Sequence, residues 1–127
     1  MIGLIINEKD NSKSLNYSLI NRGTVVWIEF GFNVGNEFGG RHPAVILRRS
    51  GSSAFVVPLS SKTPKNIQDF HVRIDKVYNF AEMQRWANVL RIKDVSINRI
   101  DFNASIGNVK GKDLDNINIA INKSRIF

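Results

Sequence analysis

RGTVVWIEFGFNVGNEFGGRHPAVIL (residues 22–47) contains the pattern that decides the fold. TVVWIEF (24–30) is β-branched and aromatic with an alternating character, which is typical of a strand. GFNVGNEFGGRH (31–42) carries four glycines and two asparagines. It is too long for a tight hairpin, and loops of this kind are often functional. PAVILRR (43–49) predicts a second strand, because proline is tolerated at a first strand position, where no ladder donor is needed.

Short segments with strand character continue beyond this stretch. They are AFVVPLSS (54–61) after the turn SGSS (50–53), FHVRID (70–75) after the polar loop KTPKNIQD (62–69), and WANVLRIKDVS (86–96), which we expect to form two strands interrupted near Lys93 and Asp94. Several short strands separated by turn signals predict a barrel or a sandwich rather than a parallel sheet.

The tail of the chain has a helical period. Apolar residues recur at i, i+3, i+6 and i+7 on one helix face, namely Leu114, Ile117, Ala120 and Ile121. Gly111 precedes this segment as a breaker, and Asp113 is the expected N-cap. We therefore predict a mainly β protein with a C-terminal α-helix packed on a small barrel.

The length of the chain sets its domain organisation. A chain of 127 residues fits one domain. Residues 1–21 become polar and mixed after the first six, so we expect an N-terminal extension there and a single domain over 22–127. A small domain buries a limited share of its surface, and many such proteins gain stability by dimerising.

The composition excludes several classes of chemistry. There are no cysteines, so disulfides and thiolate metal sites are excluded, and with two histidines and no suitable carboxylate cluster we expect neither metal nor cofactor. No apolar run approaches the roughly 20 residues that cross a bilayer. The first residues lack the basic region and cleavage site of a signal peptide, so we expect a cytoplasmic protein without a membrane partner.

The distribution of charge points to a polyanionic partner. The chain has 18 basic and 11 acidic residues, a net charge of +7. Between Glu37 and Asp69 there is no acid. The same interval holds five cations: Arg41, Arg48, Arg49, Lys62 and Lys65. This pattern favours nucleic-acid binding, and the alternative is a solvated basic face.

Three segments together carry a family resemblance. Residues 22–47 contain an R-G-T start, a strand with an aromatic residue and an acid, the pattern G-x-E-x-x-G, and a basic residue close to P-A-V-I-L. FVVPLSSK (55–62) and ANVLRIKDVSINRI (87–100) follow in order. At this spacing the segments resemble the MazF/PemK toxins of type II toxin–antitoxin systems over residues 22–124. No piece is decisive alone, and together they are specific.

The resemblance implies an SH3-like barrel of the MazF/PemK/CcdB-like plasmid maintenance toxin type. It also implies a homodimer with a groove for single-stranded RNA, and a cognate antitoxin protein that occupies this groove. The implied activity is a metal-independent endoribonuclease that leaves a cyclic phosphate.

Metal-free cleavage of RNA needs a base for the 2′-hydroxyl, an acid for the leaving 5′-oxygen and positive charge for the phosphorane. The family places an arginine directly before the proline, but here His42 precedes Pro43 and Arg41 lies one residue earlier. Either His42 replaces the arginine as acid or base while Arg41 binds phosphate, or the loop shifts so that Arg41 enters the cleft. Alternatively, both are only a polar start to the strand.

Other candidate residues follow from the same resemblance. Ser60 aligns with the family's hydroxyl residue, Ser61 is its near equal, and either can instead satisfy a turn. Glu37 matches the acid of G-x-E and is expected to orient a basic neighbour. Gly39 and Gly40 let the backbone approach a phosphate, or simply give the loop flexibility.

Cations and aromatic residues complete the candidate set. Lys62, Lys65, Arg85 and Arg91 are candidate contacts to the RNA backbone if the groove lies where the family places it. Phe32 and Phe38 either stack on bases or pack on the barrel. The remaining expectations place Trp27 in the core, give His71 a structural role, and put Trp86 at a dimer interface or an antitoxin site.

Two other functions remain open on the sequence. The first is a catalytically impaired relative that binds RNA or a protein partner, because histidine stands at the arginine position. The second is a gyrase-inhibiting toxin, since such toxins share this barrel. The basic stretch 41–65 argues against the second, because an RNA groove explains its charge more directly.

Overall fold

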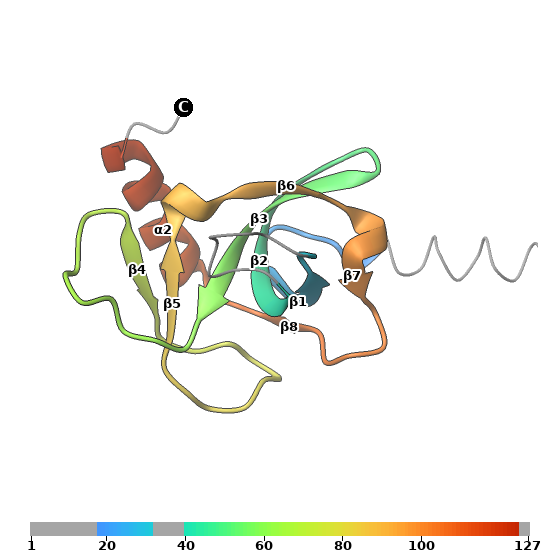
Figure 1. The fold of residues 1–127 in the computed structure, drawn as a ribbon, viewed down its shortest axis with the longest axis horizontal. Helices are drawn as coiled ribbons and strands as arrows, with labels where there is room; N and C mark the ends of the chain where they lie inside the picture. Colours follow the sequence, from blue (N-terminus) through green and yellow to red (C-terminus); the bar gives the residue numbers. More distant parts are fainter. Residues whose placement is uncertain (1–17, 32–39, 125–127) are drawn as a thin grey trace, which may run out of the picture.

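A computed structural model describes residues 18–31 and 40–124. These residues form an antiparallel β structure with one α-helix at the C-terminal end (Figure 1). The strands are β1 (Thr24–Glu29), β2 (Arg41–Ser50), β3 (Ser53–Ser60), β4 (His71–Ile74), β5 (Arg85–Asn88), β6 (Lys93–Ser96), β7 (Ile100–Asp101) and β8 (Gly107–Asn108). Two 3-10 helices, η1 (Val89–Arg91) and η2 (Ile97–Arg99), and the helix α2 (Gly111–Ser124) complete the described elements.

The sheet is open and bends about its central strands. Its strand order is β4-β5-β3-β2-β1-β7, with β6 paired to β3 and β8 paired to β1. Strand β3 pairs with β6 over residues 53–56 and with β5 over 59–60, so one strand belongs to both halves of the sheet. The predicted mainly β fold with a C-terminal helix is confirmed.

The first hairpin begins its second strand earlier than expected. The sequence predicts a loop over 31–42, but Arg41 already pairs with Glu29 and His42 with Ile28. The Phe30 N–H donates to the Gly40 carbonyl at 2.8 Å, which extends the pairing by one further rung. The predicted loop boundary is therefore wrong, because the partner strand β1 continues the ladder past the proline.

The break within 86–96 also lies elsewhere than predicted. Lys93 and Asp94 are inside β6, where they pair with Val56 and Phe55, respectively. The chain turns at η1 instead, because the Asn88 side chain accepts a hydrogen bond from the Leu90 N–H at 2.9 Å and caps the 3-10 turn.

A tight turn and a bulge shape the β2–β3 hairpin. Gly51 has φ of 61° between the paired residues Ser50 and Ser53, and a positive φ at the first of two turn residues is typical of a type II′ hairpin. The register shifts between Ile46 and Arg48. A bulge of this kind bends a strand and increases its twist, which helps the sheet to curve.

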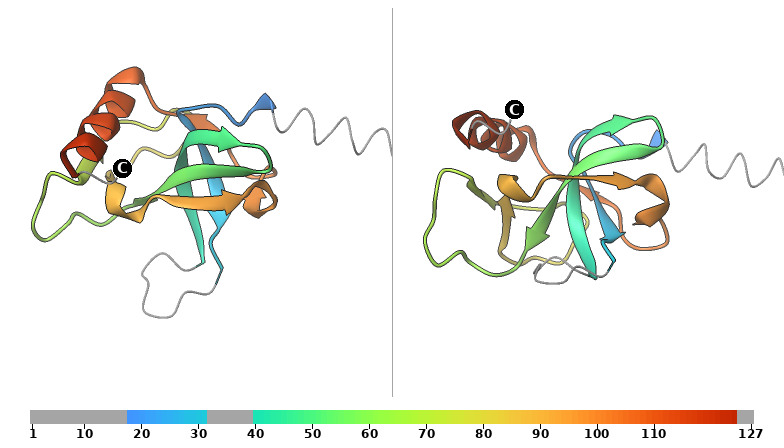
Figure 2. Two further views of the ribbon diagram at one scale, coloured as in Figure 1. Left: turned by 90° about the horizontal axis from the view of Figure 1, so that it is seen from above. Right: turned by 45° about the horizontal axis from the view of Figure 1, so that its top comes forward.

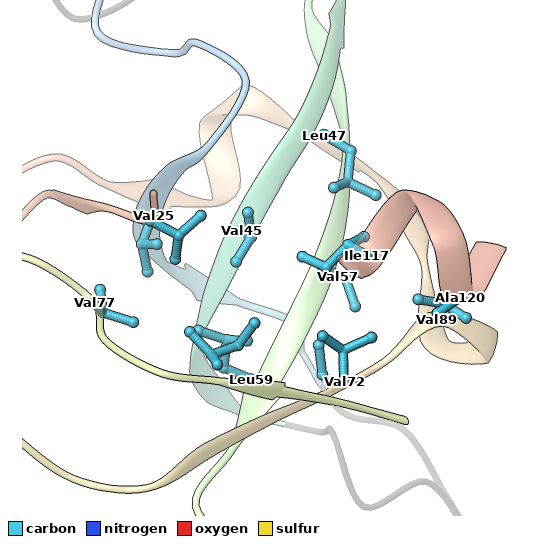
Figure 3. Close-up of a cluster of buried hydrophobic side chains, with 13 residues drawn as sticks. Val25, Val45, Leu47, Val57, Leu59, Val72, Val77, Val89, Ile117 and Ala120 are labelled. Carbon is cyan, nitrogen blue, oxygen red and sulfur yellow. The ribbon is translucent and has the colours of Figure 1, made fainter. Parts of the chain in front are cut away.

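Helix α2 covers one face of the sheet with the predicted apolar stripe. Ile117 and Ala120 are buried, and Leu114 and Ile121 pack against the same cluster from its edge. Figure 3 shows Ile117 and Ala120 among strand residues that include Val57. The helix packs against β4 and η1, at one end of the molecule (Figure 2). Burial of these aliphatic side chains stabilises the helix on the sheet.

A second hydrophobic cluster lies between β1, β2, β3 and the residues after β6. Its buried members are Ile20, Val26, Ile28, Ala44, Ile46, Ala54, Val56, Ile97 and Ile100. Ile20 is 3% exposed, so a side chain of the expected N-terminal extension packs into this core.

Asp113 is not the N-cap of the terminal helix. The Lys110 carbonyl accepts hydrogen bonds from the Asp113 and Leu114 N–H groups, and α2 begins at Gly111. The Asp113 carboxylate instead accepts from the Asp75 N–H at 3.3 Å and is 3% exposed. The predicted cap is wrong because the first turn starts earlier and places the carboxylate inward. Across residues 18–31 and 40–124, no helix has the length and apolar character needed to span a bilayer.

Candidate functional site

A cavity of about 340 Å³ lies where β2 begins and β3 ends. We call it the cleft. Its walls bring together six of the predicted site residues and four others: Arg41, His42, Ser60, Ser61, Lys62 and Arg85, with Trp27, Pro43, Leu59 and Met83. These residues come from β1, β2, β3, the loop after β3, the segment before β5 and the first residue of β5. The cleft therefore depends on the β2–β3 pairing for its shape.

Arg41 reaches the cleft from the face of the sheet that carries Trp27. Its guanidinium carbon lies 5.2 Å from the centre of the Trp27 ring, within cation–π range. Its Nη1 also lies 2.8 Å from Asp101 Oδ2. The Arg41 side chain is 49% exposed, so the guanidinium is held in place while one side stays open to solvent.

His42 lies on the opposite face of β2, as the alternation of a strand requires. Its ring centroid is 6.4 Å from that of Phe30, and it pairs with Ile28 in the ladder. Both Arg41 and His42 nevertheless border the cleft, because they are the first two residues of β2, where the sheet ends. The presence of His42 at the cleft therefore does not exclude Arg41 from it.

Ser60 and His42 occupy equivalent places on their strands. Ala44 pairs with Pro58, and each of the two residues lies two positions beyond that pair, toward the same end of the sheet. Ser60 Oγ accepts a hydrogen bond from the Lys62 N–H at 3.1 Å, which leaves its own hydroxyl proton for donation. Ser61 and Lys62 follow in the exposed loop. The cleft therefore combines an imidazole, hydroxyls and cations.

An aromatic pair forms a further part of the site. The expectation that Trp27 is a core residue is wrong, because Trp27 is only partly buried at the rim of the sheet. It stacks on Phe80 with centroids 5.9 Å apart and an interplanar angle of 9°. Its position two residues before the end of β1 could have signalled this role, whereas no local pattern marks Phe80.

Arg85 packs its guanidinium against the Phe80 ring of this pair. It is 6% exposed, its Nη2 donates to the Ala81 carbonyl at 3.1 Å, and its guanidinium carbon lies 5.4 Å from the Phe80 ring centre. Burial lowers the pKa of Arg85 from its ordinary value. Arg85 borders the cleft, and one of its N–H groups is already bonded to the Ala81 carbonyl.

Gly107 allows β8 to pass close to this aromatic pair. A methyl group at Gly107 would overlap the Tyr78 carbonyl oxygen and lie 2.8 Å from Phe80 Cδ1. Only a residue without a side chain fits between them. Gly107 thus fixes where Phe80 sits, and Phe80 in turn supports Trp27.

A second cavity of about 470 Å³ adjoins the cleft and shares Ser60 and Lys62 with it. We call it the side pocket. It is lined by Ser60, Lys62, Thr63, Pro64, Lys65, Asn66, His71, Trp86, Ala87 and Asn88. His71 is held there by a hydrogen bond from the Gln68 N–H to its Nδ1 at 2.9 Å.

Some predicted site residues lie elsewhere. The Gly40 N–H donates to the Gly31 carbonyl at 2.8 Å, so the ladder uses the group that was expected to meet a phosphate. Arg91 is exposed in η1 and borders neither cavity. Lys65 lines the side pocket but not the cleft. Glu37, Gly39, Phe32 and Phe38 lie outside the described residues.

The two cavities together form a basic surface. Among their described lining residues there is no aspartate or glutamate, while Arg41, Lys62, Lys65 and Arg85 contribute cations. Within 18–31 and 40–124, no group of three or more histidine or acidic side chains is placed to hold a metal ion. A cleft of this charge suits a polyanion whose phosphates face guanidinium and ammonium groups.

The described residues thus combine a small, open antiparallel sheet, a terminal helix and a basic, hydroxyl-bearing cleft. The chain belongs to the PemK-like, MazF-like toxins of type II toxin–antitoxin systems, because the sequence model of this family matches residues 21–124. No curated protein sequence matches the chain.

Solved structures share the fold at low sequence identity. An endoribonuclease in complex with its cognate antitoxin from a mycobacterial species has a TM-score of 0.62 at 16% identity, covering 82% of this chain and 92% of that one. The Mycobacterium tuberculosis toxin MazF-mt6 has a TM-score of 0.62 at 14% identity, covering 82% and 96%. MazF in the MazE–MazF complex from Deinococcus radiodurans has a TM-score of 0.60 at 14% identity, covering 84% and 95%.

Proposed function

We propose that the chain is the toxin of a type II toxin–antitoxin pair and cleaves single-stranded RNA without a metal ion. The observation that carries this proposal is the cleft, in which His42, Arg41 and Ser60 border one cavity. These groups supply proton transfer, positive charge and hydrogen bonding, which are the requirements of metal-free phosphodiester cleavage.

The proposed reaction is an internal transfer at one phosphate. His42 removes the proton of the 2′-hydroxyl, and the 2′-oxygen attacks phosphorus while the bond to the 5′-oxygen breaks. Arg41 and Lys62 lie against the phosphate oxygens as negative charge develops. Ser60 donates its hydroxyl to one of these oxygens, and the 5′-oxygen takes the proton that His42 accepted. The products are a 2′,3′-cyclic phosphate and a 5′-hydroxyl.

Membership of the family supports two partners for this chain. We propose that a cognate antitoxin covers the cleft, as the antitoxin-bound state of two structural relatives suggests. We also propose a homodimer, since 127 residues give a small core and dimerisation adds buried surface. The substrate would be met in the cytoplasm, where single-stranded messenger RNA is present.

The proposal is tested with purified full-length protein and a labelled single-stranded RNA in excess EDTA. We expect cleavage to continue in EDTA, and the 5′ fragments to end in a cyclic phosphate. A substrate with 2′-deoxyribose at the cleaved position should remain intact, because the attacking hydroxyl is missing. Cleavage that requires added metal, or that proceeds on the deoxy substrate, would refute the mechanism.

A second candidate function rests on one contact. Arg41 is paired with Asp101, so its guanidinium is partly neutralised in the free protein. A chain of this kind could bind RNA without cutting it. Tight binding of varied RNA sequences with no products after long incubation would favour this binding module over the nuclease.

A further inference from the structure

Trp86 carries a buried hydrogen-bond donor that has no partner among residues 18–31 and 40–124. Its side chain is 9% exposed, and its Nε1 is one of two buried side-chain nitrogen or oxygen atoms without a hydrogen-bond partner among the described residues. Leaving a buried donor unsatisfied is unfavourable. Such a group calls for an acceptor from outside the protein, such as a water molecule or a ligand.

Trp86 lies beside the side pocket. Trp86 pairs with Ser60 across the β3–β5 ladder and lines the side pocket. Ser60 also borders the cleft. A nucleotide next to the cleaved phosphate is therefore within reach of the side pocket, which at about 470 Å³ falls in the size range of small-ligand sites.

The other polar groups of the side pocket are also donors. His71 Nδ1 accepts from the Gln68 N–H, so a neutral imidazole carries its proton on Nε2. Asn88 Oδ1 accepts from the Leu90 N–H, so the amide nitrogen is the group that Asn88 offers to a ligand. Lys62 and Lys65 add ammonium groups, and no acid lines the pocket among the described residues. The pocket is therefore matched to a ligand rich in acceptors.

We propose that the side pocket binds a nucleobase of the RNA substrate and selects uracil, with the Trp86 N–H donating to a base carbonyl. Uracil presents two carbonyl oxygens and a single N–H. Adenine has no carbonyl oxygen, and its acceptors N1 and N7 lie beside an exocyclic amino group, which would face the donors of the pocket. This inference rests on the proposed RNA substrate. It adds the base preference and the residue that reads it.

The test measures binding rather than cleavage. Heptamers of 2′-O-methyl uridine and 2′-O-methyl adenosine cannot be cut at the 2′-position, and their affinities are measured by fluorescence anisotropy with the full chain. The wild type should bind the uridine heptamer at least about fivefold more tightly. Trp86→Phe keeps an aromatic ring and removes the N–H, so it should weaken uridine binding three- to tenfold, with adenosine binding unchanged.

Two controls keep the result interpretable. Tyr78→Phe removes one donor from a half-buried aromatic residue outside both cavities, and it should leave both affinities unchanged. Thermal unfolding and light scattering verify that each variant folds and keeps its oligomeric state. The proposal would be overturned if Trp86→Phe weakened the binding of both heptamers equally, or of neither. It would also be overturned if the wild type bound neither heptamer, or if the variant changed its oligomeric state while the base preference stayed intact.

The outcome is independent of the nuclease test. If uridine preference depends on Trp86 while no RNA is cleaved, the base pocket stands and the proposed catalysis falls. If RNA is cleaved and Trp86→Phe changes neither preference nor cut site, the catalysis stands and the base pocket falls.

Discussion

The Arg41 guanidinium and the Asp101 carboxylate form an ion pair across strand β1. Arg41 is the first residue of β2 and Asp101 the last of β7, on either side of β1, and their charged atoms lie 2.8 Å apart. Trp27, on β1 between them, pairs with Asp101 and lies beneath the guanidinium. The proposed phosphate-binding cation is thus positioned by an acid and an aromatic ring.

Asp101→Asn is expected to release Arg41 for the phosphate. The pair is partly exposed, so its loss should cost at most about 1 kcal/mol of unfolding free energy. Affinity for single-stranded RNA should rise, and the slope of log K against log salt should steepen by about 0.7 for one added phosphate contact. An unchanged slope would show that Arg41 does not reach the backbone.

His42→Ala is expected to lower the cleavage rate by about 10²–10⁴, the usual contribution of a general acid or base. Arg41→Ala should lower it by a similar factor through loss of transition-state charge stabilisation. Arg49→Ala is the matched control, since Arg49 is an exposed arginine near the other end of β2 and borders neither cavity. If the His42 and Arg41 variants both cut like the parent, the site is misassigned.

Gly107→Ala is expected to disturb the aromatic pair. The new methyl group overlaps the Tyr78 carbonyl and crowds Phe80, so the strand must shift, at a cost of about 1–3 kcal/mol of stability. The Trp27–Phe80 stack should loosen with it, which tryptophan emission would report, and urea unfolding gives the stability change. Full stability with unaltered emission would argue against this contact.

Asp113→Asn is expected to flatten the dependence of stability on pH. Burial is the main cause that raises the pKa of Asp113 above its ordinary value of 3.8. The native state therefore holds a proton that the unfolded chain has released, and the contribution of Asp113 to stability decreases as pH rises from about 3.8 through the raised pKa. Asparagine can still accept from the Asp75 N–H and does not titrate.

Urea unfolding of both proteins between pH 3.5 and about 7 measures this effect. The stability of the parent relative to Asp113→Asn should decrease with rising pH and then level off. A relative stability that grows with pH would mean that the carboxylate is favoured in the folded state.

Local pattern predicted much of the fold and less of the site. The alternation in 24–30 and the apolar stripe of Leu114 and Ile117 identified β1 and α2, because both depend on the chain's own period. The short strands β7 and β8 were not predicted, since two residues carry no period and owe their strand geometry to β1. The helix start was misplaced because Asp113 bonds to the distant Asp75 N–H.

At the site, the residues beside Pro43 and at the end of β3 could be named from the sequence and do border one cleft. Phe80 could not, because its contact with Trp27 joins segments far apart in the chain. The side pocket was also beyond reach, since only the structure shows that the Trp86 Nε1 has no partner within the described part of the chain.

Ser60 and Lys62 are common to both cavities, whereas Lys65 and Asn66 belong to the side pocket alone. If the chain is a nuclease as proposed, mutation at the shared pair would alter scission and target choice together, and selection would remove most such changes. Mutation at Lys65 or Asn66 would then alter target choice while sparing scission. Under the proposed function, a surface loop would let lineages of this chain diversify their target messages with the cutting chemistry inherited intact.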